Sequence, residues 1–529
     1  MRQPSVMKHS FARVPSAEIP RSSFDRSHGY KTTFDAGLLI PVFVDEALPG
    51  DTFNMRMTAF GRLSTPLHPF MDNMFLDSFF FAVPVRLIWD NWQKFNGEQE
   101  DPGDSTDFLV PTMTAPAAVG YGALTLSDYF GIPTGIPDLV HASLWHRAYN
   151  LIWNEWFRDQ NLQNSVVVDT DDGPDNPADY VVLRRGKRHD YFTSSLPWPQ
   201  KGPAVPLPLT GDAPIVGLGN STGIGASGSL TVRETGQSPG TRSITGWTSN
   251  TEALLWEEDS SASGYPNIRA DLSAVTAATI NELRQSFQIQ KLYERDARGG
   301  TRYTEIVRSH FGVTSPDQRL QRPEYLGGGS TPVNVNPVAQ TSSTDATTPQ
   351  GNLAAFGTLT AHNHGFTKSF TEHCVLIGLV CVRADLNYQQ GLNRMFSRST
   401  RWDFYWPALS HIGEQGVLNK EIYAVGSGVA GQDDLVFGYQ ERYAEYRYKP
   451  SAITGQFRSS HATPLDAWHL AQDFAALPVL NASFIEENPP VDRVIAVPTE
   501  PHFLLDAYMR LRCARPMPVY SVPGLIDHF

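Results

Sequence analysis

The residues of this chain that could perform chemistry include a group with metal-ligand character: His362, His364, His373 and Cys374. A His-x-His spacing can place two imidazoles on one face of a strand, and zinc accepts both His and Cys as ligands. However, Cys374 leads into an apolar run, and no second pair of ligands follows it. We therefore expect structural histidines here, and we predict no metal site and no cofactor.

Other patterns resemble motifs of enzymes and binding proteins without meeting their requirements. Five aspartates between 169 and 179 suggest a calcium loop, but the stretch lacks the glycine and terminal glutamate spacing of an EF-hand. The segment Gly223–Gly228 matches GxGxxG, yet it lies inside a Gly/Ser-rich stretch rather than between a strand and a helix. There is no P-loop, GxSxG or HExxH motif. We expect a protein that is not an enzyme.

A more informative segment is 387–402, which combines arginines with aromatic residues and contains no acid. Arginines pair with phosphates, and aromatic rings stack on unpaired bases, so this composition suits a single-stranded nucleic acid. It equally suits a loop between subunits whose arginines meet acids of a neighbouring copy. Both interpretations stay open for its three arginines: Arg394, Arg398 and Arg401.

A second basic cluster occupies 184–188 and contains Arg184, Arg185, Lys187 and Arg188. It could bind phosphate, but the sequence favours a hairpin turn decorated with cations.

The charge of the chain is uneven. The net charge of −13 argues against nucleic-acid binding by the protein as a whole. Residues 1–31 nevertheless carry six cations against two acids, a net +4, which leaves about −17 on the remainder. We expect a basic arm over 1–30 that touches nucleic acid, although a solvated tail would give the same composition. The candidate cations are Arg2, Lys8, Arg13, Arg21, Arg26 and Lys31.

The elements that must position these residues are mainly strands. Short runs of β-branched and aromatic residues alternate with turn residues, which predicts strands near 34–44, 52–60 and 74–88. The run 74–88 is nearly continuous in apolar residues, as expected for a strand buried on both faces, and the apolar run 375–382 predicts a buried strand. If Cys374 and Cys381 share one strand, their odd spacing places them on opposite faces. No segment is long and apolar enough to insert in a membrane. Helices are predicted at about 139–160, 276–298 and 464–476.

Two stretches differ in composition from these elements. Residues 204–275 are rich in Gly, Ser, Thr and Pro and carry seven acids against three arginines, which indicates a surface insertion with short strands such as 229–232. Residues 326–353 also suggest a loose connection. The expected organisation is an arm over 1–30, a core formed by 31–203 and 276–529, and the insertion 204–275.

Several segments resemble gokushovirus major capsid proteins, the coat proteins of a group of single-stranded DNA phages in the microvirus family. The resemblance begins with the block from Phe24 to Glu98 and continues in the same order over roughly two-thirds of the chain. Its most extended later segments are LRQSFQIQKLYERDARGGTRYTEIVRSHFGVTSPDQRLQRPEYLGGGS (283–330) and HGFTKSFTEHCVLIGLVCVRADLNYQQGLNRMFSRSTRWDFYWPAL (364–409), and shorter ones include SLPWPQKGPAV (195–205) and CARPMPVYSVPGLIDHF (513–529).

The resemblance implies an all-β fold, an eight-stranded antiparallel jelly roll with long loop insertions and a few helices. It also implies a T=1 icosahedral shell of sixty copies, assembled in the host cytoplasm around circular single-stranded DNA and found in the virion. The basic arm, and less directly Arg394, Arg398 and Arg401, would then face the DNA. Further implied partners are a small basic DNA-binding protein, an internal scaffolding protein and a DNA pilot protein.

The insertion 204–275 would form a protrusion at the threefold axes and contact a bacterial surface receptor. The candidate receptor-facing residues are Asp212, Asn220, Arg233, Glu234, Trp247 and Glu257. The chief alternative is a jelly-roll protein that binds or hydrolyses carbohydrate, which would need a concave aromatic face and a carboxylate pair. A soluble single-strand binding protein is a further alternative.

Overall fold

The computed structural model describes residues 20–203, 280–314, 321–347, 349–429 and 431–520, together with Val205 and four short strands. The chain forms two compact units, one made of 1–199 and 299–529 and the other of 200–298. The second unit contains the helix α4 (Ile280–Gly299) and four strands that pair as β9 with β10 and β8 with β11. These strands are β8 (Ala213–Pro214), β9 (Gly228–Val232), β10 (Gly240–Ile244) and β11 (Arg269–Ala270).

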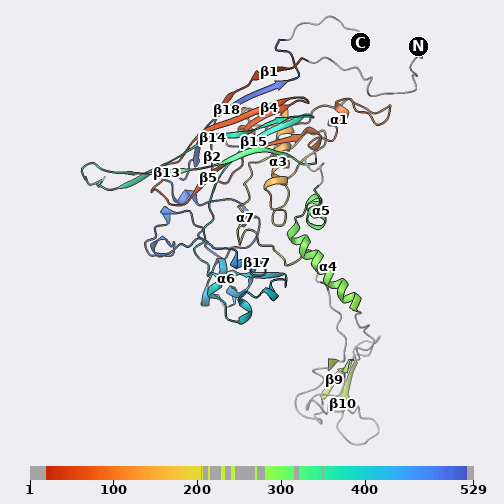
Figure 1. The fold of residues 1–529 in the computed structure, drawn as a ribbon, viewed down its shortest axis with the longest axis vertical. Helices are drawn as coiled ribbons and strands as arrows, with labels where there is room; N and C mark the ends of the chain where they lie inside the picture. Colours follow the sequence, from red (N-terminus) through yellow and green to blue (C-terminus); the bar gives the residue numbers. More distant parts are fainter. Residues whose placement is uncertain are drawn as a thin grey trace. The chain divides into compact units, whose positions relative to one another are not determined.

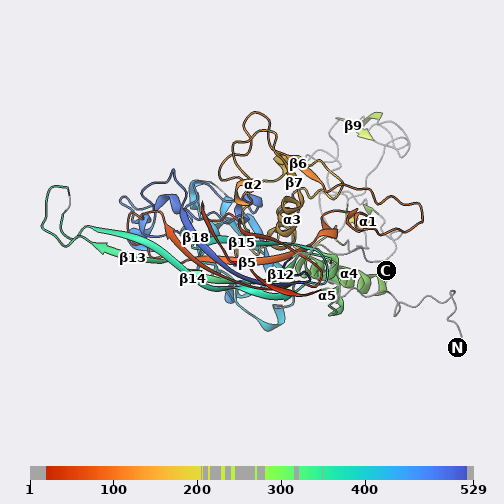
Figure 2. The ribbon, with the colours of Figure 1, turned by 90° about the horizontal axis from the view of Figure 1, so that it is seen from above.

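The first unit is built on two antiparallel sheets (Figure 1). The first sheet has the central order β2-β18-β4-β14, with β1 also paired to β18 and β13 to β14. Figures 1 and 2 show β13 and β14 running out together beyond the other strands of this sheet. Its strands are β1 (Ser22–Asp25), β2 (His28–Phe34), β4 (Thr52–Leu63), β13 (Asn334–Ala339), β14 (Leu353–Ser369) and β18 (Phe503–Arg515).

The second sheet has the order β12-β5-β15-β3. Chain-adjacent strands such as β2 and β3, or β4 and β5, lie in different sheets, which is the connectivity of a jelly roll. The predicted all-β jelly roll with long insertions and few helices is therefore confirmed. The strands of this sheet are β3 (Ile40–Ala47), β5 (Met74–Pro84), β12 (Glu324–Pro332) and β15 (Cys374–Ala384).

The main hydrophobic core lies between the two sheets. It contains the inward residues of β4 and β18, such as Met57 and Met509, and those of β5 and β15, such as Phe80 and Leu376. Cys374 belongs to this core, whereas Cys381 belongs to a second core on the other side of β15. The prediction that these two cysteines face opposite sides of one strand is confirmed.

The second core forms because the long β5–β12 connection folds over the outer face of the second sheet. Helix α3 (Leu144–Ile152), continued by a helical turn at Trp153–Phe157, packs Ala148, Tyr149 and Ile152 against Ile377 and Cys381 of β15. Figure 2 shows α2, α3, β6 and β7 gathered on one side of the two sheets. Every residue of β15 is consequently buried. We call residues 85–183 of the β5–β12 connection, whose apolar side chains form this second core, the covering layer.

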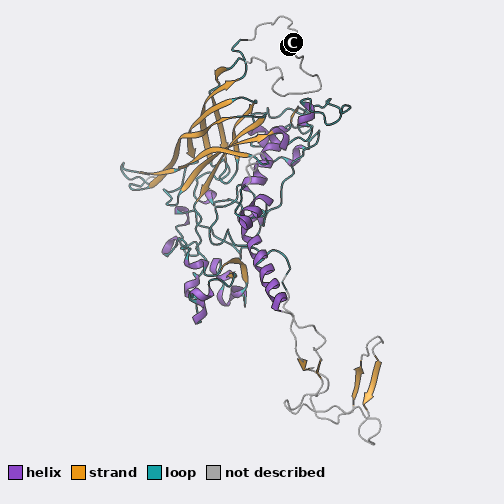
Figure 3. Ribbon diagram, turned by 45° about the vertical axis from the view of Figure 1, so that its right-hand side comes forward, coloured by secondary structure: helices purple, strands orange, loops and turns teal. Residues whose placement is uncertain are grey.

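A third, smaller core lies within the β15–β18 connection and includes Tyr388, Val417 and Phe437. The remaining elements of the first unit are short (Figure 3). They include α1 (Trp92–Phe95), α2 (Leu126–Tyr129), α5 (Tyr303–Phe311), α6 (Asn419–Ile422), α7 (Ala482–Ile485), β6 (Thr112–Thr114), β7 (Val140–Ala142), β16 (Glu414–Leu418) and β17 (Val436–Glu441). Among the described residues, no helix is long and apolar enough to cross a membrane.

The structure corrects the prediction of a helix at 464–476, where it has only the short turn Asp466–Trp468. The backbone amides that a helix would use find partners elsewhere, since Leu470 N donates to Asp72 Oδ2 and Gln472 N donates to the carbonyl of Asn387. Tertiary hydrogen bonds thus override the local helical pattern.

Two further predicted segments have different boundaries in the structure. The helix predicted from 139 begins at Leu144, because Val140–Ala142 pairs with Thr112–Thr114 as a strand. The stretch predicted to be a loose connection begins with glycines that belong to strand β12. There Gly328 allows close approach to β5, and Gly327 and Gly329 allow close approach to β14.

Candidate nucleic-acid interface

The outer face of the first sheet is bare, unlike that of the second. Buried and exposed residues alternate along β4 and β18, so one side of each strand faces the core and the other faces solvent. The outward side carries five cations, which define what we call the basic face: Lys31, Arg56, Arg62, Arg510 and Arg512.

The register brings these cations together. Arg510 of β18 lies directly opposite Arg56 of β4, and Arg512 lies opposite Asn54. Like charges in directly opposite positions destabilise a sheet. Among the described residues, no carboxylate forms an ion pair with Arg56, Arg62, Arg510 or Arg512. The arrangement would therefore be stabilised by an external anion.

Two carboxylates offset part of this charge. Asp506 pairs with Lys31 at 3.1 Å, and both side chains are more than half exposed, so the pair is weak. Asp25 of β1 lies opposite Arg512. The hydrogen bonds from Ser27 and then the charges of Arg512 and Arg510 lower the pKa of Asp25. The face still holds an excess of positive charge.

Aromatic side chains are interspersed with the cations. Phe60, Tyr508 and Phe356 are 47%, 53% and 43% exposed, although the sandwich core is available on the opposite side of each strand. Phe60 lies opposite Asp506, one outward position along the strand from Arg62. Exposed rings among arginines form the combination that binds unpaired bases and phosphates without sequence preference.

The structure places the predicted arm cations at different positions. Lys31 joins the basic face, whereas Arg26 pairs with Asp45 at 2.7 Å and Arg21 donates to Thr52 Oγ1 at 2.6 Å. Residues 22–25 and 28–34 are strands, so the expected extended arm ends by Ser22. Arg2, Lys8 and Arg13 lie outside the described residues.

The three arginines of 387–402 lie away from the basic face, in the β15–β18 connection. Arg394 pairs with Glu421 at 2.9 Å, and Arg398 pairs with Glu445 at 3.5 Å. Acids of the same chain therefore already neutralise these two cations. Arg401 instead lies over the rings of Trp402 and Trp406. Whether any of the three contacts DNA stays a prediction.

These arginines support an exposed aromatic surface. Arg398 lies over the rings of Phe404 and Tyr446, and Tyr405 contacts Tyr446. Each of the five rings is at least 40% exposed, which is unusual for a contiguous apolar group on a solitary protein. We call this group the aromatic surface: Trp402, Phe404, Tyr405, Trp406 and Tyr446.

The sequence interpretation overlooked four of the five cations of the basic face, namely Arg56, Arg62, Arg510 and Arg512. The signal was present, because both strands alternate apolar and polar residues and each places two arginines at polar positions of equal parity. What the sequence could not show is that β4 and β18, which lie near opposite ends of the chain, are neighbours in the sheet.

Of the metal-like histidines, His364 is held by hydrogen-bond partners within the fold. His364 lies 2.7 Å from Ser78 Oγ and 3.0 Å from Thr331 Oγ1, and burial lowers its pKa. The described residues contain no group of three or more His, Cys, Asp or Glu side chains that could hold a metal ion. Burial also raises the pKa of Cys374 and of Cys381 to about 12.

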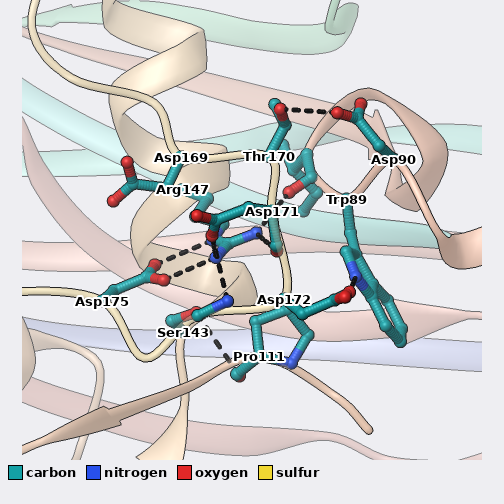
Figure 4. Close-up of polar contacts among 12 residues, drawn as sticks. Trp89, Asp90, Pro111, Ser143, Arg147, Asp169, Thr170, Asp171, Asp172 and Asp175 are labelled. Carbon is teal, nitrogen blue, oxygen red and sulfur yellow. Dashed lines mark hydrogen bonds and ion pairs between the residues drawn. The ribbon is translucent and has the colours of Figure 1, made fainter. Parts of the chain in front are cut away.

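The aspartates of 169–179 stabilise the covering layer (Figure 4). Asp175 accepts from Nε and Nη2 of Arg147, and both side chains of this ion pair are fully buried. Asp172 accepts from Trp89 Nε1 at 2.7 Å, and Thr170 donates to Asp90. These contacts occupy oxygens of Asp172 and Asp175 that a calcium ion would otherwise bind.

A jelly roll with long connections and one bare, basic sheet face belongs among the folds of viral coat subunits. The family model described as capsid protein (F protein) matches residues 12–525, and the chain belongs to this family.

Three curated relatives are similar in sequence to this chain over nearly their whole length. The chain is 50% identical to "Capsid protein VP1" of Bdellovibrio phage phiMH2K, covering 99% of this chain and 98% of the relative. It is 46% identical to "Capsid protein VP1" of Chlamydia phage 1, with the same coverage. It is 38% identical to "Capsid protein VP1" of Spiroplasma virus 4, covering 98% of this chain and 97% of the relative. A capsid role of the microvirus type follows.

Proposed function

We propose that this capsid protein assembles into a T=1 icosahedral shell of sixty copies that encloses circular single-stranded DNA. The observation that carries the DNA part of this proposal is the basic face. Its opposed arginines lack carboxylate partners among the described residues, and its aromatic rings are exposed. A packaged genome supplies both the phosphates and the unpaired bases that such a face binds.

The basic face also resolves an apparent conflict with the net charge of −13. A uniformly acidic subunit would repel DNA, but electrostatic interactions are screened beyond about 8 Å at physiological salt, so the local surface decides. The basic face then turns toward the genome, while acidic surfaces elsewhere keep the shell soluble. A small basic DNA-binding protein would neutralise further phosphates.

The aromatic surface supports assembly. Contiguous exposed rings of this extent mark interfaces, and aromatic and arginine residues are enriched at interface cores. A neighbouring copy that covers Trp402, Tyr405 and Trp406 would remove this apolar area from water. We propose that the arginines beneath these rings serve contacts between copies rather than contacts with DNA.

Electron microscopy of the purified full-length protein, combined with nuclease protection, tests both parts. We expect closed particles that protect single-stranded DNA. Arg56→Glu with Arg510→Glu should leave particles intact while reducing protected DNA severalfold, and Lys449→Glu serves as a control with a single charge reversal at another exposed site. Particles that retain the full amount of DNA in the double variant would contradict the proposed orientation of the basic face.

The N-terminal arm is tested by deleting residues 2–19. The deletion must stop there, because residues 22–25 and 28–34 pair with β18 and a longer truncation would remove part of the sheet. We expect the trimmed protein to form shells that retain less DNA. Unchanged packaging would exclude the proposed interior role of Arg2, Lys8 and Arg13.

Host attachment through 204–275 is also proposed, and its six candidate residues lie outside the described residues. Replacing 206–268 by a short Gly/Ser linker should abolish adsorption to cells without preventing assembly. Scaffolding and DNA pilot proteins, and assembly in the host cytoplasm, complete the proposal. No particular observation favours a carbohydrate-binding, hydrolytic or soluble DNA-binding protein, and the names of the relatives support a structural role.

A further inference from the structure

A cavity of about 730 Å³ opens on the outer side of the second sheet. Its floor consists of Phe79 and Phe81 of β5 with Tyr325 of β12, and its walls come from 156–161, 185–189 and 300–305. This volume lies in the range of small-molecule sites. Since it belongs to the second sheet, the cavity is separate from the basic face. We call it the Trp156 cavity.

Part of the lining is aromatic. The ring of Phe81 lies 5.6 Å from that of Trp156 and 5.6 Å from that of Tyr325. Phe81 is buried, but Trp156 and Tyr325 remain 38% and 42% exposed. The Trp156 indole is held in place, because its Nε1 donates to the carbonyl of Pro323. Two exposed rings, of which Trp156 is held in place, therefore border the cavity and can stack on a flat ligand. Arg322 already lies over the Trp156 ring, 4.7 Å from its centroid.

The rest of the lining is largely charged: it includes Asp159 and Glu305 as well as five cations. Three of these cations, Arg158, Lys187 and Arg188, form no ion pair with a described carboxylate, and Arg188 is exposed. By contrast, Arg302 pairs with Glu155 and Glu305, and Arg185 pairs with Asp77. The Nε of Arg158 is buried without a hydrogen-bond partner in the described part of the chain.

A second hollow of about 390 Å³ adjoins the first. Four residues line both hollows, and among them Arg188 and Tyr325 are exposed. A ligand with an aromatic part and an anionic part can thus place one part against the rings and the other beside Arg188 and Arg158.

We propose that the Trp156 cavity binds a nucleoside phosphate, either as a free nucleotide or as part of a single-stranded DNA chain. The base stacks on Trp156 and Tyr325, and the phosphate accepts hydrogen bonds from Arg188 and Arg158. An acidic peptide would use the arginines but would leave the exposed rings without a flat partner. This assignment does not rest on the proposed role of the basic face.

The test measures binding of three probes to the purified full-length protein: dAMP, inorganic phosphate and an oligothymidylate carrying a photoreactive iodouridine. Arg188→Glu should weaken dAMP binding about tenfold or more, because it removes a charge-assisted contact and adds repulsion. Tyr325→Leu should weaken dAMP binding by about tenfold through loss of stacking. Lys449→Glu, a charge reversal at another exposed cation, should leave it unchanged.

The outcomes are distinguishable. Binding of dAMP alone identifies a free nucleotide as the ligand, and oligonucleotide cross-links at Trp156 or Tyr325 identify DNA. Equal affinity for phosphate and dAMP, unchanged binding in Arg188→Glu, or binding of a glutamate-rich peptide in place of dAMP would overturn the proposal. Arg56→Glu with Arg510→Glu should not alter dAMP binding, so failure here and failure of the proposed packaging role can be told apart.

Discussion

The two sheets of the sandwich share one core but differ in what lies on their outer faces. Along β4 and β18 of the first sheet, every second residue is exposed. Along β15 of the second sheet, every residue is buried, because the covering layer supplies a second core. One sheet thus exposes charged and aromatic side chains to solvent, while strand β15 of the other is covered by the chain's own connection.

This difference indicates at which positions the fold tolerates substitutions. Residues on the covered side are fixed by packing from both directions, whereas outward residues of the bare side contribute little to the core. Stability alone would favour mixed charges over directly opposed arginines, and this is the reason for proposing an anionic partner for the basic face.

The largest predicted effect lies in the covering layer. Arg147→Met leaves the carboxylate of Asp175 buried without its partner, and breaking a buried ion pair in this way costs about 3–5 kcal/mol. Burial raises the pKa of Asp175, but the hydrogen bonds from Arg147 and Tyr180 outweigh burial and hold that pKa below its usual value. Urea unfolding, followed by tryptophan fluorescence, should show the loss.

Two variants make this prediction specific. Arg147→Met combined with Asp175→Asn should recover part of the lost stability, because the unpaired charge is gone. On the basic face, Arg62→Met should change the free energy of unfolding by about 0.5 kcal/mol or less, as for most surface substitutions. If Arg62→Met were as costly as Arg147→Met, the contrast between the two faces would be wrong.

The sequence predicted the jelly roll from strand-like runs and from the family resemblance, and it predicted from apolar composition that β15 is a buried strand. It did not predict the basic face, because Arg56 and Arg510 become neighbours only through the pairing of β4 with β18. It also failed at 464–476, where long-range hydrogen bonds replace helical ones. The Trp156 cavity combines segments from separate parts of the chain, so no local pattern could reveal it.

A smaller effect is expected from His146, which lies in the covering layer and contacts Ser127 Oγ at 2.9 Å. Burial, and then the charge of His141, lowers the pKa of His146 to about 3. In the unfolded chain the pKa is about 6.5, so below that pH the unfolded state binds a proton that the folded state excludes. The stability contributed by neutral His146 is therefore complete above pH 6.5 and is lost as the pH falls toward 3.

His146→Gln keeps a hydrogen-bonding side chain but removes this titration. Between pH 7 and pH 5, the free energy of unfolding of the unmodified protein should fall by about 2 kcal/mol more than that of the variant. Denaturant titrations at the two pH values provide the comparison, in which the other histidines cancel. Parallel pH profiles would mean that His146 takes up a proton in the folded protein.

The smallest effect on stability, and the sharpest test of the comparison, comes from Arg510→Gln on the bare sheet. Removing one of two directly opposed cations should stabilise the protein by a few tenths of a kcal/mol, in the range of about 0.2–1 kcal/mol for cross-strand pairs. The same change should reduce the salt dependence of single-stranded DNA binding by about 0.7 in the log–log slope, since one phosphate contact is lost.

Lys449→Gln, which removes an exposed cation elsewhere, should leave both quantities unchanged. A gain in stability together with a loss of DNA binding is the result expected of a residue retained for its partner. If Arg510→Gln instead destabilised the protein and left the salt dependence of DNA binding unaltered, the outward arginines would stabilise the sheet itself. The proposal that the basic face binds the genome would then be wrong.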